Sequence, residues 1–418
     1  MSSDSSSTMP SANSQSISSA RQPTPHTTWI AFTLTVVLFS IVAALTLNPP
    51  RHLMRKLHRH APKPILTIAA KIPFSRYLVE PPSDLAIAIR SFSDYSFAQQ
   101  KIANGRYAAW EKMSAKHRLL GRKLDWKTKL EQIEDAIEDN AKLTDELATI
   151  GMEVANKTGE LVGLRSMFAR QDGRVIEVLK HFVRDWSDEG KRERDALFPP
   201  ILDALKAEFH QQRDSDEPLK ALVPGSGLCR LAYEISELGF ATDANDYSHF
   251  MNIGAKLVFT RTVKPHQYRV KPWIHNLSHQ RSTANTLRIN TFPDIVPNTS
   301  ASLKFVPGNF LDIEGLARFD AVVTMFFIDT AKNLCDYFET IWRLLKPGGI
   351  WINEGPLLYY GQPGMALPLD DVIKLAELIG FKIEQRKTLN NVSYTADSQG
   401  MYNFLYDCEF WIARKPSQ

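Results

Sequence analysis

The sequence predicts a doubly wound α/β domain that is preceded by a helical region and by one membrane-spanning helix. Three observations carry this prediction. Short apolar runs alternate with amphipathic segments after residue 219, apolar residues recur at helical spacing across 84–210, and an uncharged apolar run occupies 29–47. The 418 residues suffice for two or three domains, and 44% hydrophobic with 23% charged residues excludes a mainly disordered or fibrous chain.

The first 83 residues divide into three segments. Residues 1–27 are rich in Ser, Thr, Pro and Gln, and we predict disorder because so few large apolar side chains cannot offset the entropy of ordering. The apolar run at 29–47 would span about 28 Å as a helix, close to the thickness of a bilayer's hydrocarbon core. We therefore predict one transmembrane helix at 28–48, followed by a basic juxtamembrane linker at 49–83.

Three other interpretations of the apolar run fit less well. A cleaved signal peptide has a shorter apolar stretch with basic residues before it, whereas here the basic residues follow. A buried core helix is the simpler alternative, but the run is long, uncharged and next to a disordered tail. A mitochondrial presequence would be amphipathic and rich in Arg. The positive-inside rule then places the basic flank and the rest of the chain on the cytoplasmic side of a single-pass membrane protein.

The positive charge is concentrated behind this run. The chain has 50 Lys+Arg and 46 Asp+Glu, a net charge of +4, and the five basic residues of segment 51–63 account for the excess, because 45 basic against 46 acidic residues remain. That segment would attract anionic lipid head groups. Because no broad basic surface is left, we expect no nucleic-acid partner. The three cysteines are scattered, which fits neither a disulfide framework nor a metal site and suits a reducing compartment.

The segments 84–210 and 211–418 follow different patterns. The first, for example at 127–150, has the three- and four-residue apolar spacing of amphipathic helices. In the second, the 40 or so residues at 262–302 interrupt the alternation, and an insertion of this length often forms a functional lid. The predicted strands are 219–223, 240–244, 304–306, 319–328, 350–353 and a terminal hairpin of 381–388 with 402–413, and the predicted helices are 228–238 and 331–345.

Polar groups follow the first three predicted strands. Gly225 and Gly227 form a Gly-x-Gly turn before a helix, which lets a backbone and a helix N-terminus approach a nucleotide. Asp246 ends the second strand, where a carboxylate can accept ribose hydroxyls. Asn309 and Phe310 follow the third and could contact an adenine edge and ring. With the Lys-Pro-Gly-Gly turn at 346–349, and with arginine at the third glycine position of a dehydrogenase motif, these features favour S-adenosylmethionine over NAD.

Several longer stretches carry a more specific signal. They are HFVRDWSDEGKRERD at 181–195, PGSGLCRLAYEISELGF at 224–240, NDYSHFM at 245–251, KPWIHNLSHQRS at 271–282, FPDI at 292–295, PGNF at 307–310, FFIDTAKN at 326–333, IWRLLKPGGIWINEGPLLYY at 341–360 and YDCEFWIARKP at 406–416. On these stretches the chain resembles the carnosine N-methyltransferase family. The resemblance covers roughly residue 84 to the C-terminus, and its fold would be a Rossmann-like class I methyltransferase sheet. It implies methyl transfer from S-adenosylmethionine to an imidazole nitrogen of carnosine, a small peptide, giving anserine.

The resemblance also implies roles for individual residues. His181 and Arg184 stand where the family holds the methionine end of the cofactor; Arg184 suits a carboxylate, and His181, in place of a glutamine, can still donate. Asp246 replaces the family's longer acid at the ribose, and Met325 completes the cofactor set with the two glycines, Asn309 and Phe310.

The predicted acceptor side is built around Asp329. In the family this acid contacts the substrate beside the cofactor, and it could accept the N–H of the imidazole while the other nitrogen attacks the methyl group. The alternative is that Asp329 caps the helix starting at Ala331. Tyr406, which we also assign to catalysis, and Tyr394 match family tyrosines, Phe404 lacks a hydroxyl, and Tyr360 replaces a histidine.

Three alternatives to carnosine methylation remain. The acceptor could be another imidazole peptide or a histidine of a larger protein, since two polar substrate contacts are changed. The chain could also be a membrane scaffold that binds the cofactor without turnover. A homodimer is the oligomeric state we consider.

Overall fold

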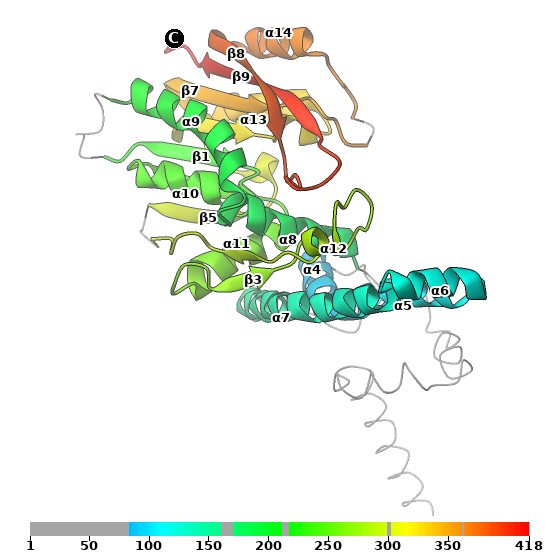
Figure 1. Ribbon diagram of the computed structural model, residues 1–418. Helices are drawn as coiled ribbons and strands as arrows, with labels where there is room; N and C mark the ends of the chain where they lie inside the picture. Colours follow the sequence, from blue (N-terminus) through cyan, green and yellow to red (C-terminus); the bar gives the residue numbers. More distant parts are fainter. Residues whose placement is uncertain (1–82, 160–169, 211–216, 299–301, 362, 418) are drawn as a thin grey trace, which may run out of the picture. The chain divides into compact units, whose positions relative to one another are not determined.

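The computed structural model describes residues 83–159, 170–210, 217–298, 302–361 and 363–417. Residues 80–418 form one compact unit, most of which is drawn in colour in Figure 1. Within the described ranges, no helix combines the length and the apolar character needed to cross a membrane. The predicted disordered tail (1–27), transmembrane helix (28–48) and all but the last residue of the linker (49–83) lie outside these ranges.

A seven-stranded sheet forms the centre of this unit. Its strand order is β5-β2-β1-β6-β7-β9-β8, with parallel pairing from β5 to β7 and antiparallel pairing of β9 with both β7 and β8. The doubly wound α/β prediction is confirmed, as is the terminal hairpin. The strands are β1 (Lys220–Pro224), β2 (Ala241–Asp246), β5 (Leu303–Pro307), β6 (Phe319–Met325), β7 (Leu345–Gly355), β8 (Lys382–Ser393) and β9 (Leu405–Arg414).

Helices cover both faces of the sheet, and alternate residues of each central strand face opposite layers. On β7, Ile350 and Ile352 join the larger hydrophobic cluster, which includes residues of α8 to α11, whereas Trp351 joins the second cluster with α13 and α14. This alternation is the period of two that a strand buried on both faces must satisfy. The helices are α8 (Asp172–Trp186), α9 (Lys191–Glu208), α10 (Arg230–Glu237), α11 (His249–Arg261), α13 (Leu334–Leu344) and α14 (Leu369–Ile379).

The N-terminal part of the unit is helical, as the spacing predicts. Its longest helix, α7, carries a buried stripe that includes Leu130, Ile133 and Ile137, and α4 and α5 pack against it (Figure 1). Close packing requires Gly151, because a Cβ there would lie 2.6 Å from the side chain of Ile89. These helices are α4 (Asp84–Ser93), α5 (Tyr95–Glu111), α6 (Ala115–Lys123) and α7 (Trp126–Thr158).

The insertion at 262–302 forms its own small element. It folds into a two-stranded antiparallel sheet of β3 (Tyr268–Val270) and β4 (Asn290–Phe292), with the one-turn helix α12 (Thr283–Thr286) between them. Asn140 of α7 binds the backbone of Lys271 twice, at 2.8 and 2.9 Å, so the insertion is tied to the helical region.

The predicted boundaries fail around the fourth strand. β6 ends at Met325, three residues earlier than predicted, because Phe326 adopts a positive φ of 50° and residues 328–330 form the 3-10 turn η3 (Ile328–Thr330). The next helix accordingly starts at Leu334 instead of residue 331. The Lys-Pro-Gly-Gly segment lies within β7. β9 starts at Leu405 instead of 402, since Met401 and Tyr402 contact His279 of the insertion.

Candidate active site

The Gly-x-Gly turn and the acid of the second strand meet at the carboxyl edge of the sheet. Gly225 and Gly227 adopt φ of 66° and 56°, which only glycine adopts at low cost. Asp246 accepts hydrogen bonds from the N–H of Gly227 at 2.8 Å and from the N–H of Ser248 at 2.7 Å. Burial raises the pKa of Asp246 to about 6. A carboxylate has about four lone-pair positions, so two remain for ribose hydroxyls.

Helix α8 brings His181 and Arg184 to the same edge. The Nδ1 of His181 lies 2.9 Å from the carbonyl oxygen of Glu177, and since a carbonyl only accepts, this nitrogen carries the proton. Burial lowers the pKa of His181, so the ring is neutral and its Nε2 accepts from the Tyr394 hydroxyl at 3.1 Å. The donor expected of His181 is therefore already used within its own helix.

Arg184 is a buried cation with incomplete hydrogen bonding. Its Nη1 donates to Asp185 at 2.6 Å, and its Nε lies 3.6 Å from Glu193 without a hydrogen bond. The guanidinium also lies 4.5 Å from the centre of the Tyr394 ring. An orphaned N–H on a buried arginine is a group that an incoming carboxylate would satisfy.

Aromatic side chains connect this cation to the predicted acceptor residues. Phe326 stacks on Tyr394 with ring centres 4.5 Å apart and meets Tyr406 edge to face at 5.6 Å. Tyr406 in turn contacts Phe404 at 4.7 Å. The structure therefore brings together three of the four aromatic residues predicted for the acceptor site, and it adds Phe326, which the sequence reasoning did not single out.

Asp329 lies in η3, directly after the carboxyl end of β6. Its side chain is 7% exposed, and its Oδ2 accepts from the N–H of Leu358 at 2.9 Å. The alternative capping role is wrong, because the N-cap of α13 is Asn333, whose side chain accepts from Cys335. Burial raises the pKa of Asp329 to about 6, which still leaves the carboxylate charged at neutral pH.

The other predicted residues lie in different surroundings. The Oδ1 of Asn309 accepts from the N–H of Leu311 at 3.2 Å, and the buried Phe310 ring packs edge to face against Phe327 and Tyr337. Met325 is half-buried at the end of β6. Tyr360 is 83% exposed, so the structure does not place its ring inside the aromatic row.

Three buried acids beside the site escaped the sequence reasoning. Asp185 pairs with Arg184, and Glu193 accepts from the N–H of Thr395 and of Ala396. Glu354 has 0% exposure and no hydrogen-bond partner on either carboxyl oxygen, and burial raises its pKa to about 9. All three lie in stretches that match the family. Glu354 is also the single acid in an apolar strand, and this pattern could have identified it from the sequence.

Arg230, at the position of a dehydrogenase's third glycine, has a structural role. It donates to Asp294 at 2.6 Å and to Glu234 at 2.8 Å, and Arg194 binds the other oxygen of Asp294 at 2.7 Å. The insertion is therefore linked to α9 and α10 behind the glycine turn. Across the described residues, no group of three or more His, Cys, Asp and Glu side chains could hold a metal ion.

The sheet order, the glycine turn and the acid at the end of β2 define the Rossmann-like fold of class I methyltransferases. Residues 166–417 match the protein family described as carnosine N-methyltransferase, and the chain belongs to this family. A mouse carnosine N-methyltransferase is 39% identical over 252 residues, 58% of this chain and 63% of the relative. The fission yeast relative of the same description is 30% identical over 307 residues, 68% of this chain and 82% of the relative.

The match spans less than two thirds of the mouse, rat and fly relatives. Solved structures similar to the chain include an S-adenosylmethionine-dependent methyltransferase of Methanosarcina mazei, with a TM-score of 0.35 and 14% identity, covering 53% of this chain and 99% of that one. A magnesium protoporphyrin IX methyltransferase of Synechocystis has a TM-score of 0.35 and 13% identity, covering 64% and 99%.

Proposed function

We propose that the chain is an S-adenosylmethionine-dependent N-methyltransferase that acts on an imidazole nitrogen of carnosine or of a related histidine-containing dipeptide. Carnosine would give anserine. The observation that carries the proposal is Asp329, a buried carboxylate at the carboxyl edge of the sheet, on the same edge as the aromatic row and Arg184. Membership of the carnosine N-methyltransferase family supports it.

The residues present fit the cofactor. Arg184, with its unsatisfied Nε, would bind the carboxylate of the methionine part, and Asp246 would accept from the ribose hydroxyls. The glycine turn allows close approach of the backbone, and a Cβ at Gly225 would lie 2.5 Å from the Phe327 ring. When bound, the sulfonium of this cofactor supplies an electrophilic methyl group.

The residues on the acceptor side then have one main task, which is to position a nucleophile. A neutral imidazole has a free lone pair, since its pKa is near 6.5, so no base is needed to create the nucleophile. Asp329 would accept a hydrogen bond from the N–H of the other ring nitrogen and so fix the tautomer. As the attacking nitrogen bonds to the methyl carbon, the ring becomes positively charged, and Asp329 would stabilise that charge or receive the proton. The rings of Tyr394 and Tyr406 would limit the planes that the imidazole can adopt.

Two observations support a second candidate, which is an acceptor other than carnosine. Phe404 has no hydroxyl to offer, and Tyr360 is almost fully exposed. A histidine in another peptide or in a protein would need fewer contacts at these positions, because more of the substrate would lie outside the site. A non-catalytic scaffold is less well supported, since Arg184, Asp246 and Asp329 are all buried at one sheet edge.

The proposal predicts methyl transfer to imidazole peptides. Purified protein incubated with isotope-labelled S-adenosylmethionine and a panel of carnosine, other histidine dipeptides and longer histidine peptides should yield at least one product. Mass spectrometry of that product should place the methyl group on a ring nitrogen. A product from longer peptides alone would select the protein or peptide acceptor, and no product from any of them would contradict the enzymatic proposal.

We also propose that segment 29–47 anchors the chain in a membrane, with the enzyme on the cytoplasmic side. The uncharged run and the basic residues after it support this proposal. Deleting residues 1–50 should release an active enzyme into the supernatant, because all predicted site residues lie between 181 and 406. Sedimentation after a high-salt wash, which screens the remaining basic segment, provides the measurement. Continued pelleting of the shortened chain with membranes would contradict a single anchor.

A further inference from the structure

The loop between β8 and β9, residues 394–404, carries two of the predicted acceptor contacts. Tyr394 begins it, against Phe326 and Arg184, and Phe404 ends it, against Tyr406. A loop of this length on the surface would ordinarily be mobile. Here its residues are held by groups from other parts of the chain.

The start of the loop is held from the cofactor side. Glu193 of α9 accepts from the backbone N–H groups of Thr395 and Ala396, both at 3.0 Å. The same carboxylate lies 3.6 Å from the Nε of Arg184. The residues after Tyr394 are therefore fixed relative to the cationic end of the site.

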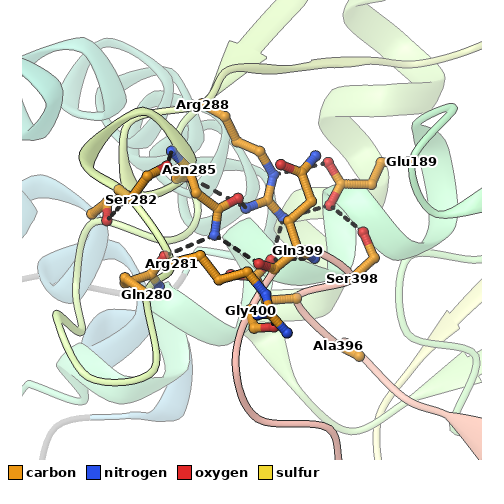
Figure 2. Close-up of polar contacts among 12 residues, drawn as sticks. Glu189, Gln280, Arg281, Ser282, Asn285, Arg288, Ala396, Ser398, Gln399 and Gly400 are labelled. Carbon is orange, nitrogen blue, oxygen red and sulfur yellow. Dashed lines mark hydrogen bonds and ion pairs between the residues drawn. The ribbon is translucent and has the colours of Figure 1, made fainter.

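The middle of the loop is held by one arginine of the insertion (Figure 2). The Nη2 of Arg288 donates to Asp397 and to Glu189, each at 2.6 Å, and its Nε donates to Glu189 at 3.2 Å. Its Nη1 donates to the side chain of Asn285 at 2.6 Å, and its guanidinium lies 4.8 Å from the Trp273 ring centre. The Arg288 and Asp397 side chains are each 12% exposed, which strengthens these contacts relative to surface ion pairs.

The end of the loop is also bound to the insertion. The Nε of Arg281 donates to the carbonyl oxygen of Gly400 at 3.1 Å, and the N–H of Met401 donates to the carbonyl oxygen of His279 at 2.8 Å. The first contact uses a single N–H of the Arg281 side chain, and the second joins two backbone groups. Arg288 differs because it joins three segments through one guanidinium: the insertion, the turn between α8 and α9, and the loop.

We propose that Arg288 is a positioning residue for the acceptor: it clasps the 394–404 loop to the insertion and so sets the distance of Tyr394 and Phe404 from Asp329. The insertion then holds the 394–404 loop in a fixed position on the acceptor side of the site. A lysine cannot replace the clasp, because its single ammonium cannot bridge two carboxylates and an amide in one plane. The role in acceptor binding rests on the proposed function, whereas the clasp itself is independent of it.

The test compares three variants of the full chain. Arg288→Ala removes the clasp, and Arg288→Lys keeps the charge. Arg269→Ala is the matched control, because Arg269 is an exposed arginine of the same insertion. We expect Arg288→Ala to raise the acceptor KM about tenfold or more, since small displacements of positioning groups carry large kinetic costs. In Arg288→Ala, the Kd for S-adenosylhomocysteine, measured by calorimetry, should stay within about twofold of the wild-type value. The acceptor KM of Arg288→Lys should lie between those of the wild type and Arg288→Ala, and the acceptor KM of Arg269→Ala should match that of the wild type.

Hydrogen exchange of residues 394–404 provides a measurement that needs no reaction. Exchange in this loop should be faster in Arg288→Ala than in the wild type or in Arg269→Ala. Unchanged exchange in Arg288→Ala would overturn the clasp. Faster exchange with an unchanged acceptor KM would overturn the role of the clasp in acceptor binding. A fall in thermal midpoint with equal losses in cofactor and acceptor affinity would show a merely structural role. If even the wild type methylates no imidazole peptide, the proposed function fails, and the exchange comparison still decides the clasp.

Discussion

Replacing Asp329 with alanine should lower kcat for methyl transfer by about a thousandfold, while cofactor affinity stays nearly unchanged. Asp329 is 7% exposed, and its carboxylate accepts from the backbone N–H of Leu358 at 2.9 Å. Without it, nothing fixes the tautomer of the imidazole or stabilises the positive charge that its ring gains. Steady-state kinetics with labelled cofactor, together with calorimetric titration of S-adenosylhomocysteine, provides the measurement.

Asp329→Asn is the matched variant for this prediction. Its amide oxygen can still accept from Leu358, but it has no negative charge, so the backbone geometry is kept and the electrostatic contribution is lost. We expect the asparagine variant to be nearly as slow as the alanine variant. Normal turnover in either variant, or loss of cofactor affinity in both, would rule out the acceptor role of this carboxylate.

Replacing Glu354 with leucine should raise the free energy of unfolding by about 2 kcal/mol at pH 8, because an unpartnered buried carboxyl is costly. Glu354 lies on β7, in register with Met325 of β6 and Phe410 of β9, and it is fully buried with no partner on either oxygen. Leucine has a similar volume and suits the apolar neighbours. Chemical unfolding followed by circular dichroism measures the difference.

The pH dependence of this gain identifies its cause. Burial raises the pKa of Glu354 from 4.5 to about 9 in the folded protein. Between these values the folded state keeps a proton that the unfolded state releases, so the wild type should lose stability as the pH rises, by at most about 1.4 kcal/mol per pH unit from this group. The loss between pH 6 and pH 8 should be smaller in Glu354→Leu.

Glu409 provides the control for this stability prediction. It pairs in register with Gly355 on β7, but Arg386 and Thr388 donate to its carboxylate at 2.8 and 3.0 Å. Glu409→Leu should therefore destabilise the protein, since it leaves both donors without their acceptor. Equal effects of the two substitutions would contradict the explanation by missing partners.

The sheet and its order of elements could be predicted because their signals are local. The apolar runs at 219–223 and 304–306 each lie within one residue of an observed strand, and the glycine turn and Asp246 lie at the expected edge. The end of the fourth strand was misplaced because Phe326 is as apolar as the residues before it. What ends the strand is its positive φ, which residue type alone does not reveal.

The arrangement within the site depended on contacts between distant residues. His181 and Tyr394 are 213 positions apart, and the hydrogen bond between them occupies the Nε2 of the histidine ring. The exposure of Tyr360 and the missing partners of Glu354 are likewise results of packing. The resemblance to a family named most of these residues, but only the three-dimensional contacts show which of them are in reach of one another.

The position of β9 has a consequence for synthesis of the chain. This strand lies between β7 and β8, and it carries Tyr406, so the sheet cannot close until residues 405–414 have left the ribosome. Until then the outer edge of β7 offers unpaired backbone groups, which are sites for aggregation. A chain that ends before residue 405 would therefore lose the continuity of its sheet along with part of the candidate active site, and nascent chains stalled before this residue should depend on chaperones.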